Sequence, residues 1–283
     1  GYLYRRVNGL FLSVGAPPLG IAEMQDGTEM CVDLRTWTEV APYYRGTYDP
    51  ECLAKIKEII DPSGWFLDIG AHIGFYSVAI SKYMDRRGVG GRVSAFEPHP
   101  GNFSRLRHNL ERNSLNRVCE CLNIALSDSK KQVDLVMRED FELGGKTGNA
   151  SLASSGKFDK KFNTIKVKSE CLDGFIERSK SLGEKKVDFI KVDIEGSEDK
   201  FLEGAKKVIE KNRPKILIEI NKPYYRDRKI DLENAIKKNI PKCYNFFALE
   251  EGYLVEKESI NAFDDIDDAF LIPVKDKAES EYL

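Results

Sequence analysis

A candidate ligand-binding turn occupies residues 66–77, FLDIGAHIGFYS. An apolar run reaches Asp68, and Gly70 and Gly74 follow four positions apart. Such a turn between a strand and a helix lets the backbone approach a nucleotide-like ligand. A dinucleotide site needs a further glycine where this chain has His72. The turn therefore indicates a cofactor without a pyrophosphate, with Asp68 accepting from an ammonium group or from backbone amides; a purely structural glycine turn is the alternative.

Two later segments suit other parts of such a cofactor. In FEP, the carboxylate of Glu97 follows Gly70 by 27 residues. A carboxylate has two oxygens and only accepts hydrogen bonds, so it can take both hydroxyls of a ribose and would repel a 2′-phosphate. In NIALSD, Asn123 or the backbone around Ala125 could meet an adenine edge. An ordinary strand-to-turn transition explains this last segment equally well.

The segment KVDIEGSE places three acids after another apolar run. Asp193 and Glu195 are one residue apart at the end of a predicted strand, and we expect them to contact the ligand or take part in catalysis. Glu198 suits the first turn of a helix, where the helix dipole stabilises an acid. Lys191 alternates with its neighbours along the strand, and its role stays open.

The elements that position these residues are alternating strands and helices, predicted from apolar runs and amphipathic patterns. The predicted strands are 65–70, 90–98, 118–126, 132–137, 187–196 and 214–220, with a closing pair at 244–257 and 268–275. The predicted helices are 49–60, 75–84, 100–114, 170–180, 197–211 and 231–240. This alternation predicts an α/β fold with a mostly parallel sheet covered by helices on both faces. Ligands of such sheets lie beyond the carboxyl ends of the strands, where the candidate residues fall.

Two further segments frame this alternation. Residues 1–50 are rich in Gly, Pro, Tyr and Thr, and we expect a small β-rich N-terminal lobe before one domain over residues 51–283. Residues 139–163 are polar and aperiodic, as in a functional loop, and we expect this loop and the lobe to shape the acceptor pocket. The opening 18 residues superficially resemble a signal peptide, but polar residues interrupt the apolar patch, so we interpret them as a strand and turn.

The composition restricts the partners. With 41% hydrophobic and 32% charged residues the chain is a globular protein, and its formal net charge of −2 does not favour nucleic acid. No apolar run reaches the roughly 18 residues of a membrane span, and we expect a cytoplasmic protein. The three histidines lack the H-x-x-x-H spacing and the cysteines form no C-x-x-C pair, so no metal site is expected. The oligomeric state is left open.

Taken in order, five segments resemble the motifs of the FkbM family of S-adenosylmethionine-dependent methyltransferases: FLDIGAHIGFYS, VSAFEPHPGNFSRLRHNLERN, NIALSD, ECLDGF and FIKVDIEGSEDKFLEGA. The resemblance covers roughly residues 44–220. The family's turn often carries Asn where this chain has His72, whose imidazole can still donate a hydrogen bond. The resemblance implies a Rossmann-like class I methyltransferase with a seven-stranded, mostly parallel sheet whose last strand is antiparallel.

The resemblance also implies O-methylation of a hydroxyl group, commonly on a sugar or a natural-product scaffold, with S-adenosylmethionine as the cofactor. It places Asp68, Gly70, His72 and Gly74 on the methionine side, Glu97 on the ribose, and Asn123 with Ala125 by the adenine. Asp193, also a cofactor contact, and Glu195 would face the reacting methyl. A general base helps a hydroxyl lose its proton, and our candidates are Glu195 or Asp193, with His72 or His99 as alternatives.

Three other functions would leave different features in the sequence. Some RNA methyltransferases share a glycine turn and an acid-rich second strand, but base N-methylation usually shows an Asn/Asp-Pro-Pro-aromatic motif after the fourth strand, where this chain reads DIEG. The segment NKPYY, after the fifth strand, lacks the paired prolines. A nicotinamide oxidoreductase would carry G-x-G-x-x-G. A non-catalytic cofactor-binding scaffold would bind S-adenosylhomocysteine without turning over any acceptor.

Overall fold

The computed structural model describes residues 19–137, 150–152, 163–179 and 185–274. The strand and turn expected in the opening segment, and most of the 139–163 loop, lie outside these residues. The residues of that segment that the structure describes, Ala150–Leu152 and Asn163, belong to strands, so the prediction of a loop is wrong there.

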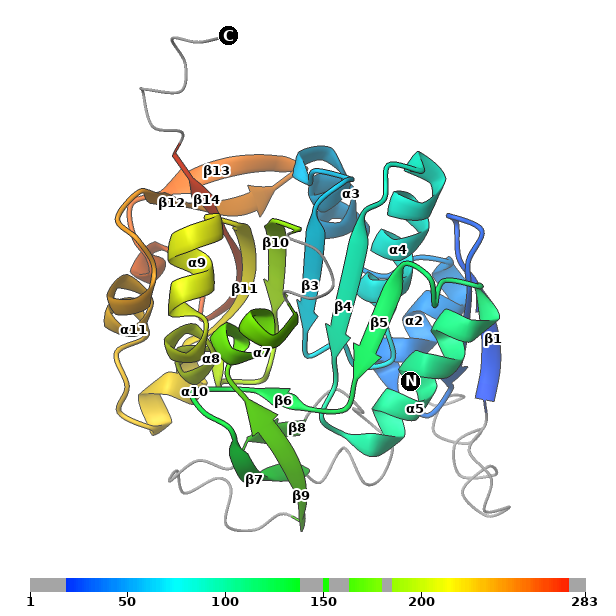
Figure 1. The fold of residues 1–283 in the computed structure, drawn as a ribbon, viewed down its shortest axis with the longest axis horizontal. Helices are drawn as coiled ribbons and strands as arrows, with labels where there is room; N and C mark the ends of the chain where they lie inside the picture. The colour runs from blue at the N-terminus through cyan, green and yellow to red at the C-terminus, as the bar shows by residue number, and fades with distance from the viewer. Residues whose placement is uncertain (1–18, 138–149, 153–162, 180–184, 275–283) are drawn as a thin grey trace, which may run out of the picture.

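The molecule is built on a sheet of eight strands in the order β13-β12-β14-β11-β10-β3-β4-β5 (Figure 1). These strands are β3 (Trp65–Ile69), β4 (Arg92–Phe96), β5 (Cys119–Leu122), β10 (Val187–Val192), β11 (Lys215–Asn221), β12 (Tyr244–Glu250), β13 (Tyr253–Lys257) and β14 (Ile266–Pro273). Neighbours from β11 to β5 are parallel, and β14 runs antiparallel to β11. The expected seven-stranded sheet with an antiparallel last strand is confirmed, and β13 extends it as a hairpin partner of β12.

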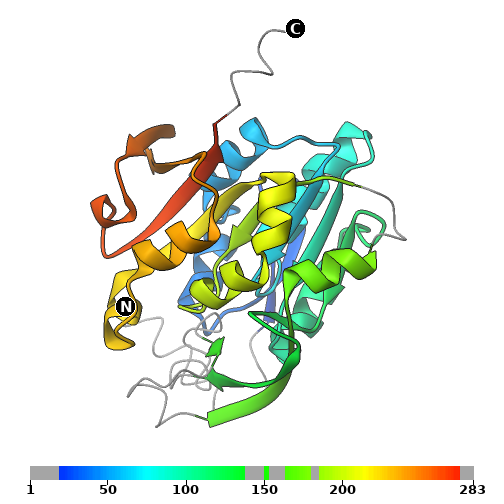
Figure 2. The same cartoon turned by 60° about the vertical axis from the view of Figure 1, so that its left-hand side comes forward.

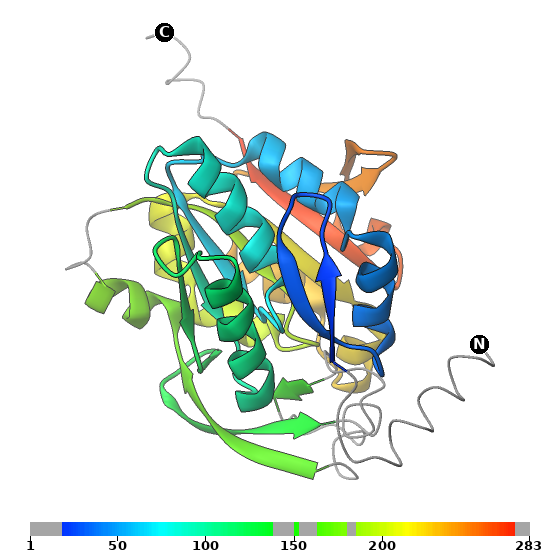
Figure 3. The same ribbon diagram turned by 90° about the vertical axis from the view of Figure 1, so that its right-hand side faces the viewer.

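Helices cover both faces of the sheet, as predicted (Figures 2 and 3). They are α2 (Trp37–Arg45), α3 (Pro50–Ile59), α4 (Phe75–Arg87), α5 (Pro100–Arg112), α7 (Leu172–Arg178), α8 (Glu198–Gly204), α9 (Lys206–Asn212), α10 (Lys222–Asp227), α11 (Leu232–Asn239) and the short 3₁₀ helix η3 (Ile260–Ala262). Consecutive residues of β3 serve opposite faces: Phe66 packs in a core with Ile80 of α4, and Leu67 in a second core with Ile209 of α9. Burial on both faces explains why this strand is a continuous apolar run.

A second sheet lies beyond the carboxyl ends of β3, β4 and β5 (Figure 1). Its order is β6-β9-β7-β8, with β6 (Ala125–Leu126), β7 (Lys131–Met137), β8 (Ala150–Leu152) and β9 (Asn163–Glu170). The predicted strand 118–126 is therefore wrong as one element, because β5 ends at Leu122 and β6 pairs with β9 instead of β4. The predicted helix 170–180 begins two residues later, at Leu172, because β9 occupies Glu170.

The N-terminal part is a hairpin of β1 (Leu19–Glu23) and β2 (Glu29–Asp33) followed by helix α2. The helix was not expected in a lobe of hairpins and loops, because Pro42 lies inside it and proline disfavours a helix interior. Met30 and Val32 of β2 belong to the same core as Phe66. The hairpin thus packs into the main domain, and a boundary at residue 50 stays a prediction.

The predicted helix 197–211 is two helices, α8 and α9, which meet at Ala205. Gly204 lies against the turn after β6, where a Cβ atom would come 2.0 Å from the carbonyl oxygen of Ser127. This close approach depends on the second sheet and leaves no local signal in the sequence.

Candidate active site

One cavity lies at the carboxyl ends of β3, β4 and β10 and is closed on another side by the second sheet. Six of the residues predicted from the sequence line it: Gly70, His72, Glu97, Ala125, Asp193 and Glu195. They come from three parallel strands and β6, and the parallel register brings their ends to one edge. The structure therefore brings these six residues together at one edge of the sheet, and their roles in binding or catalysis stay predictions.

Gly70 joins two of these strand ends by a close backbone approach. Its φ is +80°, and a Cβ atom there would lie 1.9 Å from the carbonyl oxygen of Asp193. The N–H groups of Gly70 and Ala71 both donate to the carbonyl oxygen of Phe96, at 3.0 Å. The glycine turn is thus held between β4 and β10, and only a residue without a Cβ atom fits it.

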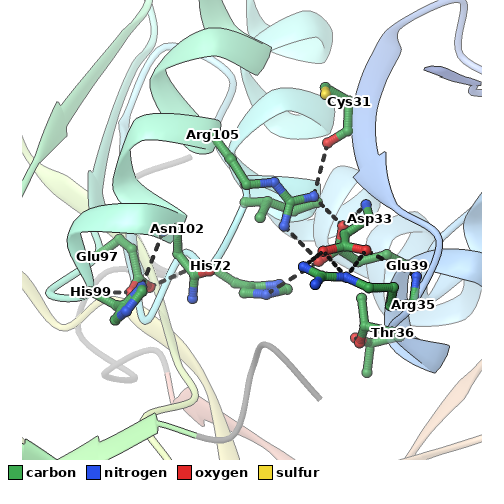
Figure 4. Close-up of polar contacts among 12 residues, drawn as sticks. Cys31, Asp33, Arg35, Thr36, Glu39, His72, Glu97, His99, Asn102 and Arg105 are labelled. Carbon is green, nitrogen blue, oxygen red and sulfur yellow. Dashed lines mark hydrogen bonds and ion pairs between the residues drawn. The ribbon is translucent and has the colours of Figure 1, made fainter. Parts of the chain in front are cut away.

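Glu97 is a buried carboxylate that organises the adjoining turns (Figure 4). The backbone N–H of His72 donates to its Oε2 and that of His99 to its Oε1, each at 2.9 Å. Burial raises the pKa of Glu97 to about 8, although these two N–H groups favour the ionised form. Each carboxylate oxygen has a second lone pair, which leaves acceptor capacity for the hydroxyls of a ribose.

Three predicted cofactor residues, Asp68, Gly74 and Asn123, lie outside the cavity lining. Asp68 is buried behind it, where its Oδ2 accepts from the hydroxyl of Ser77 at 2.5 Å and burial raises its pKa. Gly74 precedes α4, and a Cβ there would lie 2.6 Å from Leu106.

The side chain of Asn123 hydrogen-bonds to the backbone. Its Nδ2 donates to the carbonyl oxygens of Glu97 and Pro98, at 2.9 Å each. The side chain therefore ties the end of β4 to the segment after β5. Ala125, in contrast, is buried and lines the cavity together with the apolar side chains of Ile124 and Leu126. These neighbours were not singled out from the sequence, because apolar residues after a strand carry no specific signal.

Lys191, whose role the sequence left open, is a buried ammonium group in the cavity wall. Its Nζ donates to the carbonyl oxygen of Gly70 and to Oδ2 of Asp193, both at 3.2 Å, and lies 3.8 Å from Oδ1 of Asp68. Burial opposes the charge, but Asp193 and Asp68 outweigh it and raise the pKa of Lys191. Lys191 thus balances two carboxylates and orients Asp193.

The loop after β10 carries Glu195 and is held from behind by Glu198. Glu195 has a φ of +54°. Oε1 of Glu198 accepts from the N–H groups of Ile194 and Gly196, at 3.1 and 3.0 Å, and Oε2 accepts from the hydroxyl of Tyr225 at 2.5 Å. Glu198 begins α8, as predicted. It therefore shapes the loop that presents Glu195 to the cavity.

Two further acids, which the sequence analysis missed, lie near the same strand ends. Glu219 of β11 and Asp268 of β14 are cross-strand neighbours. Burial and the nearby charge of Asp193 raise the pKa of Glu219 to about 10 and that of Asp268 to about 7. We call Asp193, Glu195, Glu219 and Asp268 the acidic rim. Its members come from three strand ends that only the fold brings together.

Asp268 also lies near Asp49 and Cys52, and ligand-type atoms of the three residues are within 4.8 Å of one another. Burial, with a further contribution from Asp49 and Asp268, raises the pKa of the Cys52 thiol. Among the described residues, no helix is both long and apolar enough to cross a membrane.

Comparison with known proteins gives a family match. The sequence profile of the methyltransferase FkbM domain matches residues 68–271. No curated protein matches the chain significantly.

Solved structures with a similar fold include a methyltransferase FkbM from Methylobacillus flagellatus KT, with 21% identity over 74% of this chain and 43% of that one, at a TM-score of 0.44. An O-methyltransferase from Bacillus cereus in complex with SAH has 15% identity over 80% of each chain, at a TM-score of 0.43. TYW2 from P. horikoshii in complex with MeSAdo has 12% identity over 90% of this chain and 70% of that one, at a TM-score of 0.42. The chain thus spans less than half of the Methylobacillus protein.

Proposed function

Because the chain belongs to the FkbM family of S-adenosylmethionine-dependent methyltransferases, we propose that it methylates a hydroxyl group of a small molecule, a sugar or a natural-product scaffold. One feature carries the proposal: the glycine turn at Gly70 and the acids Asp193 and Glu195 line the same cavity. Carboxylates that can accept a proton are thus next to the turn that suits the cofactor.

The residues present fit S-adenosylmethionine. The carboxylate of Glu97 has lone pairs for the ribose hydroxyls, and the apolar side chains of Ile124, Ala125 and Leu126 suit the face of an adenine ring. Gly70 lines the cavity and allows the turn to pass directly against the backbone of Asp193. When bound, this cofactor supplies a methyl group on a positively charged sulfur, which is a good leaving group.

The chain's own residues would orient the acceptor and take its proton. A hydroxyl group has a high pKa, so a carboxylate at hydrogen-bond distance helps its oxygen to react. The hydrogen bond from Lys191 fixes Asp193, and the loop held by Glu198 fixes Glu195. We therefore assign the general base to Glu195 or Asp193, and the rest of the catalysis to alignment of the reacting groups.

The charge around the cavity favours a small acceptor over RNA. Asp193 and Glu195 place carboxyl groups in the cavity lining, and the formal net charge of −2 gives the chain no surplus of Lys and Arg. Phosphate groups are repelled by such a surface, whereas RNA-binding proteins normally present a surplus of Lys and Arg. A neutral, hydroxyl-bearing molecule meets no such repulsion.

The test measures methyl transfer to a panel of sugars and hydroxylated natural-product scaffolds, with bulk tRNA alongside. We expect Glu195→Gln or Asp193→Asn to lower turnover by about 10²- to 10⁴-fold, the range for loss of a general base. Asp188→Asn is the matched control, since Asp188 starts the same strand and pairs with Lys215 at the opposite edge.

If both rim variants kept near-normal turnover and cofactor binding, the assignment of the base would be wrong. Methylation of tRNA but of no small molecule would replace the proposal by an RNA methyltransferase. Calorimetric binding of S-adenosylhomocysteine without turnover of any acceptor would support a scaffold.

A further inference from the structure

A buried carboxylate from outside the matched family region lies next to the cavity. Glu39 is in α2, before residues 68–271, and it is fully buried. Its Oε1 accepts from Nη1 of Arg105 at 2.9 Å, and its Oε2 accepts from Nη2 of the same guanidinium. Oε2 also accepts from the N–H of Asp33 at 2.6 Å (Figure 4). The guanidinium of Arg105, 66 residues away in the chain, and the nearby N–H of Asp33 therefore fix this carboxylate in one position.

Such a pair is costly to bury, since both charges lose their hydration. The fork of Arg105 matches a carboxylate with two parallel hydrogen bonds, which supplies geometry as well as energy. Arg105 also donates to the carbonyl oxygen of Cys31 at 3.3 Å, so α5 is tied to both β2 and α2. Burial of an ion pair is weak evidence that the pair stabilises the fold. Because the Glu39–Arg105 pair borders the candidate site, a role in that site is the alternative.

His72 connects this pair to the cavity. Its Nε2 lies 3.8 Å from Oε1 of Glu39, and its side chain, which is 19% exposed, lines the cavity. Its backbone has a φ of +52°, and its N–H donates to Glu97, so the position of this residue in the turn is fixed. Thr38, next to Glu39 in α2, lines the same cavity. Helix α2 thus borders the cavity at two consecutive residues: Thr38 lines it directly, and Glu39 lies behind His72.

The imidazole of His72 is neutral at physiological pH. Burial lowers its pKa to about 4; Glu39 and Asp193 act in the opposite direction, while Arg105 and Lys191 lower it further. The Glu39–Arg105 pair therefore places a carboxylate beside the imidazole without forcing it to become charged. A neutral imidazole keeps one donor and one acceptor nitrogen.

We propose that Glu39, fixed by Arg105, is a positioning residue for the cofactor: it holds His72 in the cavity wall and makes α2 part of the cofactor site. The inference rests on the proposed function only in that the cavity binds S-adenosylmethionine. It departs from the expectation that the N-terminal lobe shapes the acceptor pocket.

The test is calorimetric titration with S-adenosylhomocysteine in a double-mutant cycle of Glu39→Gln and His72→Asn. We expect Glu39→Gln to weaken binding by about 3- to 10-fold, because the charged pairing with Arg105 is lost and the carboxylate that packs against His72 is no longer fixed. In the His72→Asn background the same substitution should have little further effect, since the residue acts through the imidazole. Asp188→Asn, which breaks the ion pair with Lys215 away from the cavity, is the control and should leave affinity unchanged.

Thermal unfolding of each variant checks that it is folded. If Glu39→Gln alone does not fold, the double variant Glu39→Gln/Arg105→Gln removes both charges together and replaces it. Arg105→Lys keeps the charge and should retain more affinity than Arg105→Gln.

An equal loss of affinity in both backgrounds would refute positioning through His72. Unchanged affinity for S-adenosylhomocysteine in Glu39→Gln would refute the inference and leave the proposed function intact. Failure of the unaltered chain to bind S-adenosylhomocysteine would instead refute the proposed cofactor site, and this inference with it.

Discussion

The substitution Gly70→Ala tests the close approach on which the cavity depends. The new Cβ atom would lie 1.9 Å from the carbonyl oxygen of Asp193, whereas real Cβ atoms essentially never come within 3.0 Å of a neighbour. The backbone at the end of β3 or β10 must therefore move by about 1 Å or more. Both strands are held in the middle of the sheet by parallel neighbours on each side, so this movement is costly.

The expected cost has two parts. Alanine at a φ of +80° costs about 1–2 kcal/mol because its Cβ crowds the following carbonyl in the left-handed region. The contact with Asp193 adds about 1–3 kcal/mol, the usual range for overpacking a tightly packed position. We expect a total loss of about 2–5 kcal/mol in the free energy of unfolding, with weaker cofactor binding because Asp193 and the turn are displaced.

The control substitution Gly88→Ala separates the conformational cost from the cost of the contact. Gly88 has a φ of +65°, and a Cβ atom there would have no neighbour within 4 Å among the atoms that the structure describes. Its substitution should therefore show only the conformational cost of about 1–2 kcal/mol and leave the cavity unchanged.

The assay is urea unfolding of the three proteins, with calorimetry of S-adenosylhomocysteine. Equal destabilisation by both substitutions, with affinity intact in Gly70→Ala, would show that the contact with Asp193 does not require a glycine. The reasoning on the turn would then be refuted.

Two further substitutions test the surroundings of the site. Burial and Asp193 raise the pKa of Glu219 from 4.5 to about 10, so the folded chain holds a proton there that the unfolded chain has released, and stability falls as the pH rises through this window. Glu219→Gln should therefore raise Tm more at pH 8 than at pH 5, and an equal shift at both would contradict the raised pKa. Tyr225→Phe removes the donor to Glu198 and should cost about 1–2 kcal/mol in urea unfolding. The control Tyr253→Phe changes a ring that is 74% exposed and should cost nothing; equal values for the two would count against the support given to Glu198.

Several features could be predicted because their signals are local. The run Trp65–Ile69 is apolar throughout because both faces of β3 are buried, and that pattern needs no knowledge of the partners. Gly70 could be singled out because a strand-to-helix turn requires a backbone conformation that favours glycine. Asp193 and Glu195 follow a strand directly, and parallel strands bring their carboxyl ends to one edge.

Other features were missed because their cause lies far away in the chain. Helix α2 contains Pro42, and its local sequence favours turns, yet the helix forms with Glu39 and Val40 buried. In β9, Ile165 and Val167 alternate with lysines, a local strand signal that was overlooked; its pairing with β7 to form the second sheet has no local signal. Asn123 was predicted to contact the cofactor and stays a prediction; the hydrogen bonds from its Nδ2 to the carbonyl oxygens of Glu97 and Pro98 have no local signal.

By itself, the sequence determined the alternating fold, the family and the edge of the sheet where the candidate site residues gather, because strand periodicity and turn glycines are properties of short segments. The tertiary structure decided which charges meet. Glu39 and Arg105 are 66 residues apart, and Lys191 and Gly70 are 121 apart. A buried charge is stable only beside a group of opposite charge or a hydrogen-bond partner. The periodicity of a short segment carries no information about a partner that lies far away in the chain and comes into contact only on folding.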